Sequence, residues 1–423
     1  MKFKVIFASV NRFIDICKIY DMSQRQSIVS FLVFVYCLII GQFAFSQKTD
    51  AALADRYNVI SHAVPFLVIS PDSRAGAMGD IGAATEPDVW SMHWNPSKYS
   101  FAKKDFGGGI SYIPWLRNLQ IKDVSETYLT GYKRIDKRQT VAMSVQYFNL
   151  GNIDFTNSDG LATGQSFSPR EFAIDAAFSR LLSKDFAFSI ALRYINSNLT
   201  GGVSSTPGEL THAAQTVASD VSGYYQKQTN FGGIPTEMRF GFNISNLGGK
   251  ISYNNSGSRD YLPATLRLGA GTTLKLDEFN DLGINFEASK LLVPTRSYTD
   301  SAGVLYGIAE NEKTSSTSAA IQSFYDAPGG IKEEWHEIMW GVGLEYWYVK
   351  QFALRGGYFY EDKSKGNRKI FTVGVGLRMS VMGFDAAYII PVAGSNSPLA
   401  NTWRISITFD IDKPKVQTQP QKI

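Results

Sequence analysis

The sequence predicts an all-β fold, a 14-stranded antiparallel transmembrane β-barrel, from three observations. Between Phe106 and Ile411, runs of about ten residues place apolar side chains at every second position. There are fourteen such runs, and bacterial single-chain barrels have even strand numbers. The links between runs alternate in length, as expected of a barrel with short turns at one rim and long loops at the other.

The N-terminus has the pattern of an export signal. Arg25 precedes an apolar run at 28–40, and Ala44-Phe45-Ser46 places small residues where a signal peptidase cleaves. We expect cleavage before Gln47, which makes residues 1–46 a signal peptide. The alternative is a membrane anchor, but the apolar run is shorter than the roughly 20 residues that span a bilayer.

The composition of residues 1–46 also bears on the exported chain. Met22 alone would open a signal of ordinary length, so 1–21 is expected to be a spurious extension. Both cysteines, Cys17 and Cys37, would be removed, which leaves no thiol for a disulfide, a metal site or catalysis. The 42 basic and 38 acidic residues would become 37 and 36, and so small a net charge argues against nucleic acid as a partner.

The predicted barrel domain covers residues 106–411, and its runs each have one apolar face and one small or polar face. In the last run Ile405, Ile407 and Phe409 alternate with polar residues. The candidate strands are centred near residues 110, 130, 144, 175, 190, 221, 241, 268, 284, 343, 355, 373, 387 and 405. A secreted β-sandwich shows the same alternation, but the number and length of the runs favour the membrane barrel.

The links between the predicted strands fall into two sets. The short ones lie at 135–137, 182–184, 276–279, 350 and 380, and the long ones include 150–169, 197–215, 248–262 and 291–336. Because outer-membrane barrels have short periplasmic turns and long extracellular loops, the long set is expected to face outward. Aromatic residues near the ends of the runs would supply the interfacial girdles.

Residues 47–105 precede the first strand and lack its period. A glycine- and alanine-rich stretch over 70–84 leads to a short motif at 94–97. This arrangement resembles the N-terminal plug, or hatch, of the long-chain fatty-acid transporter superfamily (FadL-like proteins). The residues that match the plug motif are Arg74, Gly76, Gly79, Asn95 and Pro96.

The region 337–369, with Trp340-Gly341-Val342-Gly343 and Arg355-Gly356-Gly357-Tyr358, resembles one branch of that superfamily, the PorV proteins of the type IX secretion system of Bacteroidota. The resemblance covers essentially the whole mature chain. The C-terminal tail, 412–423, departs from it, because many barrels end on an aromatic residue.

The resemblance implies an outer-membrane shuttle. Such proteins bind the C-terminal signal domain of secreted cargo, dock beside the large type IX translocon barrel, and deliver cargo to a surface attachment complex with a sortase-like protease. Membrane lipid and lipopolysaccharide are the remaining expected partners. The superfamily also permits an alternative, a transporter of hydrophobic small molecules.

An enzyme is disfavoured, because the sequence has no Gly-x-Ser-x-Gly motif and pairs no nucleophile with a base. No catalytic residue, cofactor or metal site is therefore predicted. A local cluster at 333–337, containing three glutamates and His336, is a candidate cation site. It lacks a second ligand-bearing motif, which argues against a metal.

Two long loops carry the candidate partner-binding residues, which are apolar or aromatic groups within polar segments. These residues are Phe155, Leu161, Phe167, Leu305, Tyr306, Ile321, Phe324 and Tyr325. The alternative is that they pack against one another and close the outer mouth. Charged residues on the small-residue face are expected to point into the lumen, either as a channel lining or, as we favour, as ion pairs that brace the wall.

Overall fold

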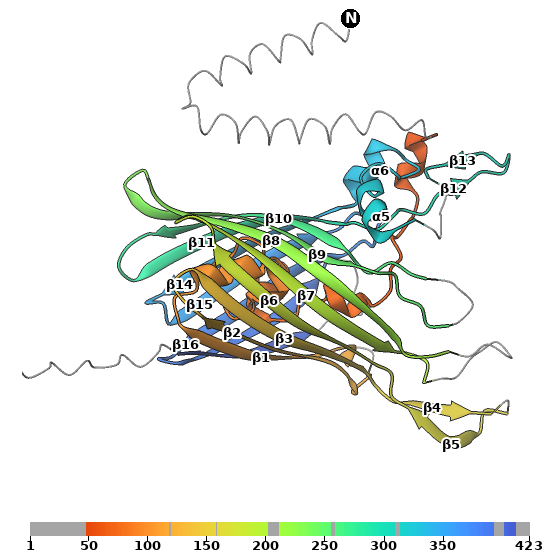
Figure 1. Cartoon of the computed structure of the whole chain (residues 1–423), viewed down its shortest axis with the longest axis horizontal. Helices are drawn as coiled ribbons and strands as arrows, with labels where there is room; N and C mark the ends of the chain where they lie inside the picture. Colours follow the sequence, from red (N-terminus) through yellow and green to blue (C-terminus); the bar gives the residue numbers. More distant parts are fainter. Residues whose placement is uncertain are drawn as a thin grey trace, which may run out of the picture. The chain divides into compact units, whose positions relative to one another are not determined.

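Strands dominate the computed structural model, which describes residues 48–117, 120–157, 159–201, 211–254, 259–308, 314–392 and 402–411 (Figure 1). The predicted signal peptide and C-terminal tail lie outside these described residues. The fold concerns the unit from Thr49 to Ile423.

Fourteen strands among the described residues close into one barrel, in which each strand pairs antiparallel with its neighbour and β1 pairs with β18. Each predicted run corresponds to one strand, so the predicted fold is confirmed. The strands are β1 (Phe106–Pro114), β2 (Val124–Arg134), β3 (Gln139–Leu150), β6 (Arg170–Leu181), β7 (Phe186–Asn198), β8 (Ala214–Phe231), β9 (Ile234–Gly248), β10 (Thr265–Lys275), β11 (Asn280–Leu291), β14 (Ile338–Tyr348), β15 (Phe352–Tyr360), β16 (Lys369–Arg378), β17 (Met382–Pro391) and β18 (Trp403–Ile411).

The two-residue period sorts side chains to the two faces of the wall. In β18, Ile405 and Phe409 are exposed on the outside, whereas Arg404 and Ser406 are buried in the lumen. The same alternation recurs around the barrel, as the outward Met143 of β3 illustrates at 62% exposure. The result is an apolar outer surface suited to hydrocarbon and a lumen lined by small and polar side chains.

The two rims differ in the length of their connections. At the turn end the strands are joined by residues 135–138, 182–185, 232–233, 276–279, 349–351 and 379–381. At the loop end the connections are 115–123, 151–169, 199–213, 249–264, 292–337, 361–368 and 392–402. By the rule for outer-membrane barrels, the turn end faces the periplasm and the loop end faces the outside.

Two of the long loops carry structure of their own. Loop 151–169 forms a hairpin of β4 (Ile153–Thr156) and β5 (Ala162–Phe167) that projects beyond the barrel (Figure 1). Loop 292–337 contains β12 (Tyr298–Thr299), β13 (Leu305–Tyr306), α5 (Ser316–Gln322) and α6 (Ile331–His336). No helix in the described ranges is long and apolar enough to cross a membrane.

Residues 49–105, called here the N-terminal segment, lie largely inside the barrel (Figure 1). The segment has short helical elements, η3 (Ala51–Asp55), η4 (Pro65–Val68), α3 (Ser73–Gly76), α4 (Ser91–Trp94) and η5 (Pro96–Phe101). Side-chain caps fix the starts of three of them, and the Asp50 carboxylate caps η3 by accepting from the Ala52 amide at 3.0 Å. The Asp72 carboxylate accepts a hydrogen bond from the Ala75 amide at 2.8 Å, and the Asn95 side chain accepts one from the Ser97 amide at 3.1 Å.

The N-terminal segment runs through the barrel from the loop end to the turn end. At the loop end, the Asp50 amide donates to the carbonyl of Pro328, and the Asn58 amide donates to the carbonyl of Ser364. At the turn end, the Asp105 carbonyl accepts from the Arg134 amide just before β1 begins. The start of the segment is therefore displayed at the outer rim.

This path predicts a labelling pattern in intact cells. A Tyr57→Cys variant is expected to react with a membrane-impermeant maleimide, because Tyr57 is 76% exposed at the loop end. A Lys184→Cys variant at the turn end, where the native side chain is 88% exposed, should react only after the outer membrane is permeabilised. Labelling of position 184 but not 57 in intact cells would reverse the orientation.

Candidate functional site

Inward-facing glycines let the N-terminal segment lie directly on the barrel wall. A Cβ at Gly343 would lie 2.6 Å from the Met78 carbonyl oxygen, and one at Gly241 would overlap the Ala83 carbonyl. We call this set the glycine track, and it comprises Gly241, Gly269, Gly271, Gly341, Gly343, Gly357 and Gly374, which face residues 77–84. The N-terminal segment therefore approaches the wall more closely than a wall residue with a side chain would allow.

The predicted plug residues Gly76 and Gly79 both occupy positions where a side chain is excluded. A Cβ at Gly76 would overlap the Arg404 guanidinium. Gly79 has φ +77°, and a Cβ there would also lie 2.7 Å from the Tyr358 carbonyl oxygen. Gly79 therefore needs both the left-handed conformation and the close approach that glycine permits.

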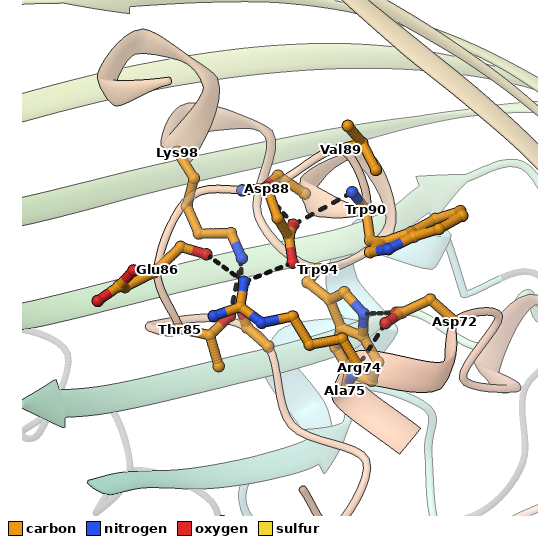
Figure 2. A network of polar contacts seen from close by, with 12 residues as sticks. Asp72, Arg74, Ala75, Thr85, Glu86, Asp88, Val89, Trp90, Trp94 and Lys98 are labelled. Carbon is orange, nitrogen blue, oxygen red and sulfur yellow. Dashed lines mark hydrogen bonds and ion pairs between the residues drawn. The ribbon is translucent and has the colours of Figure 1, made fainter. Parts of the chain in front are cut away.

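Arg74 joins the N-terminal segment to the wall through a bidentate ion pair. Its Nε and Nη2 donate to the two carboxylate oxygens of Glu345 in β14, at 2.9 and 2.7 Å. Its Nη1 donates to Asp88 at 2.8 Å and to the Glu86 carbonyl at 3.0 Å (Figure 2). Because Arg74 and Glu345 are both buried, these charges compensate each other in place of water.

The remaining plug residues hold the segment's own loops together. The fully buried Asn95 amide donates to the carbonyls of Ala83 at 2.8 Å and Gly223 at 3.1 Å, which ties the segment to β8. Pro96 occupies the first turn of η5, where its missing N–H costs nothing. The Lys98 ammonium donates to the Gly82 carbonyl at 2.9 Å, and Figure 2 shows its side chain pointing toward this loop.

The lumenal charges are paired, as the preferred interpretation of the sequence expected. The pairs within the wall or between wall and N-terminal segment are Arg193 with Asp175 and Asp220, Arg239 with Glu86 and Glu237, Arg267 with Glu287, Arg355 with Glu345 and Asp385, Arg378 with Asp385, and Arg404 with Asp80. These pairs brace the wall and the segment against each other. A selective channel lining would instead leave charges of one sign facing open water.

One cavity lies on each side of the buried part of the N-terminal segment. The outer cavity holds about 650 Å³ and is lined by apolar side chains such as Phe66 and Met339 together with Arg267. The inner cavity holds about 640 Å³ and is lined by charged residues of both signs, among them Lys103, Lys350 and Asp281. In the part of the chain that the structure describes, the two cavities share no lining residue.

The eight candidate partner-binding residues do not form one cluster. Phe155, Leu161 and Phe167 belong to the β4–β5 hairpin, where Leu161 is 66% exposed and the Phe167 ring lies against Gly201. The other five, Leu305, Tyr306, Ile321, Phe324 and Tyr325, lie in loop 292–337. The hairpin and α5 are well separated in Figure 1. Mutual packing that closes the mouth is therefore not observed between the two groups.

The acidic cluster at 333–337 binds lysines. Glu333 and Glu337 accept from the Lys365 ammonium at 2.6 and 2.9 Å, and Glu334 accepts from Lys290 at 3.1 Å. Among the described residues there is no group of side chains arranged to hold a metal ion. The sequence located the carboxylates, but their lysine partners lie in β11 and in the loop after β15, too far along the chain to be recognised.

Two carboxyl groups, Glu334 of this cluster and the nearby Asp326, predict a pH-dependent loop. Burial raises the pKa of Asp326 to about 8 and that of Glu334 to about 7, and the neighbouring carboxylates act in the same direction. The folded loop thus binds more protons than an opened one between about pH 4 and 8, so each group weakens docking by up to about 1.4 kcal/mol per pH unit in its window as pH rises.

Hydrogen exchange of loop 292–337 is therefore expected to accelerate from pH 5 to pH 9, after correction for the intrinsic exchange rate. An Asp326→Asn variant, which keeps an acceptor for the Thr295 amide, should flatten much of this dependence. Equal pH dependence in both proteins would contradict the assignment to Asp326.

Comparison with known proteins gives matches to solved structures and to one family model. A search of curated proteins found no match. Among solved structures, the chain is similar to the toluene transporter TbuX of Ralstonia pickettii, with 11% identity, coverage of 82% of this chain and 99% of that chain, and a TM-score of 0.45. It is also similar to the Pseudomonas putida toluene transporter TodX, with 13% identity, coverage of 86% of this chain and 98% of that chain, and a TM-score of 0.43. A Pseudomonas aeruginosa FadL homologue is similar with 10% identity, coverage of 80% of this chain and 98% of that chain, and a TM-score of 0.42.

The family model is the most informative comparison. The model described as Type IX secretion system protein PorV matches residues 52–298, which include the buried N-terminal segment and the strands from β1 to β11. This match covers more than half of the chain, and it agrees with a closed barrel whose outside is apolar. The chain therefore belongs to the PorV family of the type IX secretion system and is an outer-membrane β-barrel protein.

Proposed function

We propose that this protein is an outer-membrane shuttle for type IX secretion. It binds the C-terminal signal domain of exported cargo beside the large translocon barrel and delivers it to the surface attachment complex with its sortase-like protease. The supporting observation is the filled lumen, in which the N-terminal segment lies between two separate cavities. A barrel filled in this way offers its outer loops, rather than a pore, as the working surface.

The β4–β5 hairpin is the part of the outer rim that best suits cargo. It is a two-stranded sheet apart from the barrel sheet, and among the described residues each strand pairs only with the other and so has one free edge. An extended segment of a partner can add to such an edge through backbone hydrogen bonds. Ile153 and Leu161 are 48% and 66% exposed and supply apolar contacts beside that edge.

A hairpin variant tests this proposal. Replacing residues 153–167 by a short Gly-Ser turn is expected to abolish co-purification of exported proteins in a mild-detergent pull-down, while the very large barrel remains bound. The matched control is Lys184→Ala at the turn end, which should retain both partners. Full cargo binding without the hairpin would remove it as the recognition site, and absence of both partners from the native protein would overturn the shuttle.

The outer cavity supports a second candidate, a transporter of hydrophobic small molecules. Apolar side chains including Ile60, Leu291 and Ile389 line it, and its volume of about 650 Å³ lies within the usual range for small-ligand sites. Transport would require the segment that separates the two cavities to move. Mass spectrometry of extracts from the gently purified protein distinguishes this function, because a transporter should carry small apolar ligands and no exported protein.

A further inference from the structure

Helix α5 of loop 292–337 packs against the outside of the barrel wall, whereas α6 packs on η3 of the N-terminal segment at the outer rim. We call residues 314–337, which contain α5 and α6, the flap. Ala320 of α5 packs with Leu292 and Ala264, and the same cluster includes Ile244 of β9 and Leu266 of β10. Strand parity places Ile244 and Leu266 on the outward face, in series with the exposed Phe240, Met238 and Leu268.

Contacts of Lys290 are a second, independent observation that part of the flap lies on the outward side of the wall. Lys290 follows Ile284 and Phe286 in the outward series of β11, yet it is only 6% exposed. Its ammonium is covered by Glu334 and Glu337, and it lies 5.9 Å from the centroid of the Phe324 ring. A lysine that strand geometry directs toward the membrane side is thus neutralised by the flap that covers it.

The flap presents apolar side chains that stay partly or largely exposed among the described residues. Ile331 and Trp335, one helical turn apart on α6, are 79% and 60% exposed, and Ile321 and Phe324 on and after α5 are 58% and 39% exposed. Grouped apolar exposure of this kind is unfavourable in water and indicates a contact surface.

The position of the flap identifies what contacts it. Helix α6 leads directly into β14, whose outward residues Ile338, Trp340 and Val342 continue the apolar belt of the wall. The flap therefore sits at the outer edge of a surface that already faces lipid. Tryptophan is enriched at this depth because its ring is apolar and its N–H reaches the headgroups.

We propose that the flap lies in the outer leaflet of the outer membrane, with Ile321, Phe324, Ile331 and Trp335 inserted among lipid chains at the headgroup boundary. Its partner is lipid, and its effect is to anchor the longest loop at the membrane boundary beside the outer rim. This surface is distinct from the β4–β5 hairpin assigned above to cargo, so the two proposals stand or fall separately.

Single-cysteine spin labels on the full mature chain test the proposal in phosphatidylcholine nanodiscs. Labels at positions 321, 331 and 335 are compared with Leu268→Cys on the lipid-facing wall and Tyr57→Cys at the outer rim, which are 51% and 76% exposed as native residues. The ratio of oxygen to nickel-chelate accessibility is expected to be close to the Leu268 value and several-fold above the Tyr57 value. Heat-modifiable migration confirms that each labelled barrel is folded.

Two results would overturn the proposal. Ratios at 321, 331 and 335 equal to that at Tyr57 would place the flap in water. A ratio that is aqueous both in these nanodiscs and in nanodiscs containing lipopolysaccharide, and that becomes apolar only in native outer-membrane vesicles, would assign the surface to a protein partner instead of lipid.

Discussion

Replacing Arg74 by glutamine is expected to lower the stability of the docked N-terminal segment by about 3–5 kcal/mol, the usual cost of breaking a buried ion pair by removing one partner. Glutamine cannot reproduce the bidentate contact with Glu345, and it leaves Asp88 without its guanidinium partner. Glu345 keeps Arg355 at 2.7 Å, so the wall itself should remain intact. The measurement is hydrogen exchange at residues 70–84, together with single-channel conductance in planar bilayers, which should rise from a closed baseline.

Two further variants distinguish the loss of the Arg74–Glu345 ion pair from the loss of a charge in general. The double variant Arg74→Gln with Glu345→Gln is expected to be less destabilised than the sum of the single variants, with a coupling of about 1–3 kcal/mol. Lys332→Gln, which removes the exposed contact with Asp55, should change neither exchange nor conductance. Strict additivity of the two buried changes would show that Arg74 does not hold the segment through Glu345.

The strands were predictable because each one is specified locally. Within a single strand, alternate side chains face lipid and lumen, so apolar residues recur at every second position. This pattern does not depend on any residue far along the chain. Glycines within the strands allow close packing against the N-terminal segment, since Gly109 faces the Trp90 ring and Gly374 faces the Ala77 side chain. The identity of the facing residues, however, required the structure.

The path of the N-terminal segment and the fold of loop 292–337 could not be predicted from the sequence, because neither is specified locally. Neither has a regular period, and their contacts join residues far apart, as the separation of 271 positions between Arg74 and Glu345 illustrates. The candidate residues Ile321 and Phe324 were identified from composition as exposed apolar groups. Their location outside the wall follows only from two contacts of the folded chain. Ala320 packs with Ala264 and Leu292, and Lys290 of β11 lies near the Phe324 ring.

Gly357→Ala is expected to displace the N-terminal segment at a cost of about 3 kcal/mol, at the upper end of what overpacking a filled interior costs. The new methyl group would overlap the Gly79 amide nitrogen and the Met78 carbonyl carbon and would lie 2.7 Å from the Met78 Cα. These are backbone atoms, so no side chain can rotate to make room. Hydrogen exchange of residues 77–84 should increase, while the β15 ladder on both sides keeps its protection.

The adjacent glycine supplies the control. Gly356 lies in the same strand and faces outward, where the nearest heavy atom to an added Cβ is the Thr372 oxygen at 3.9 Å. Gly356→Ala changes the same backbone entropy and strand propensity as Gly357→Ala, so it should leave exchange at 77–84 unchanged. If both substitutions loosen the segment equally, strand propensity is the cause. If only Gly357→Ala does so, close backbone contact along the glycine track holds the lumen shut.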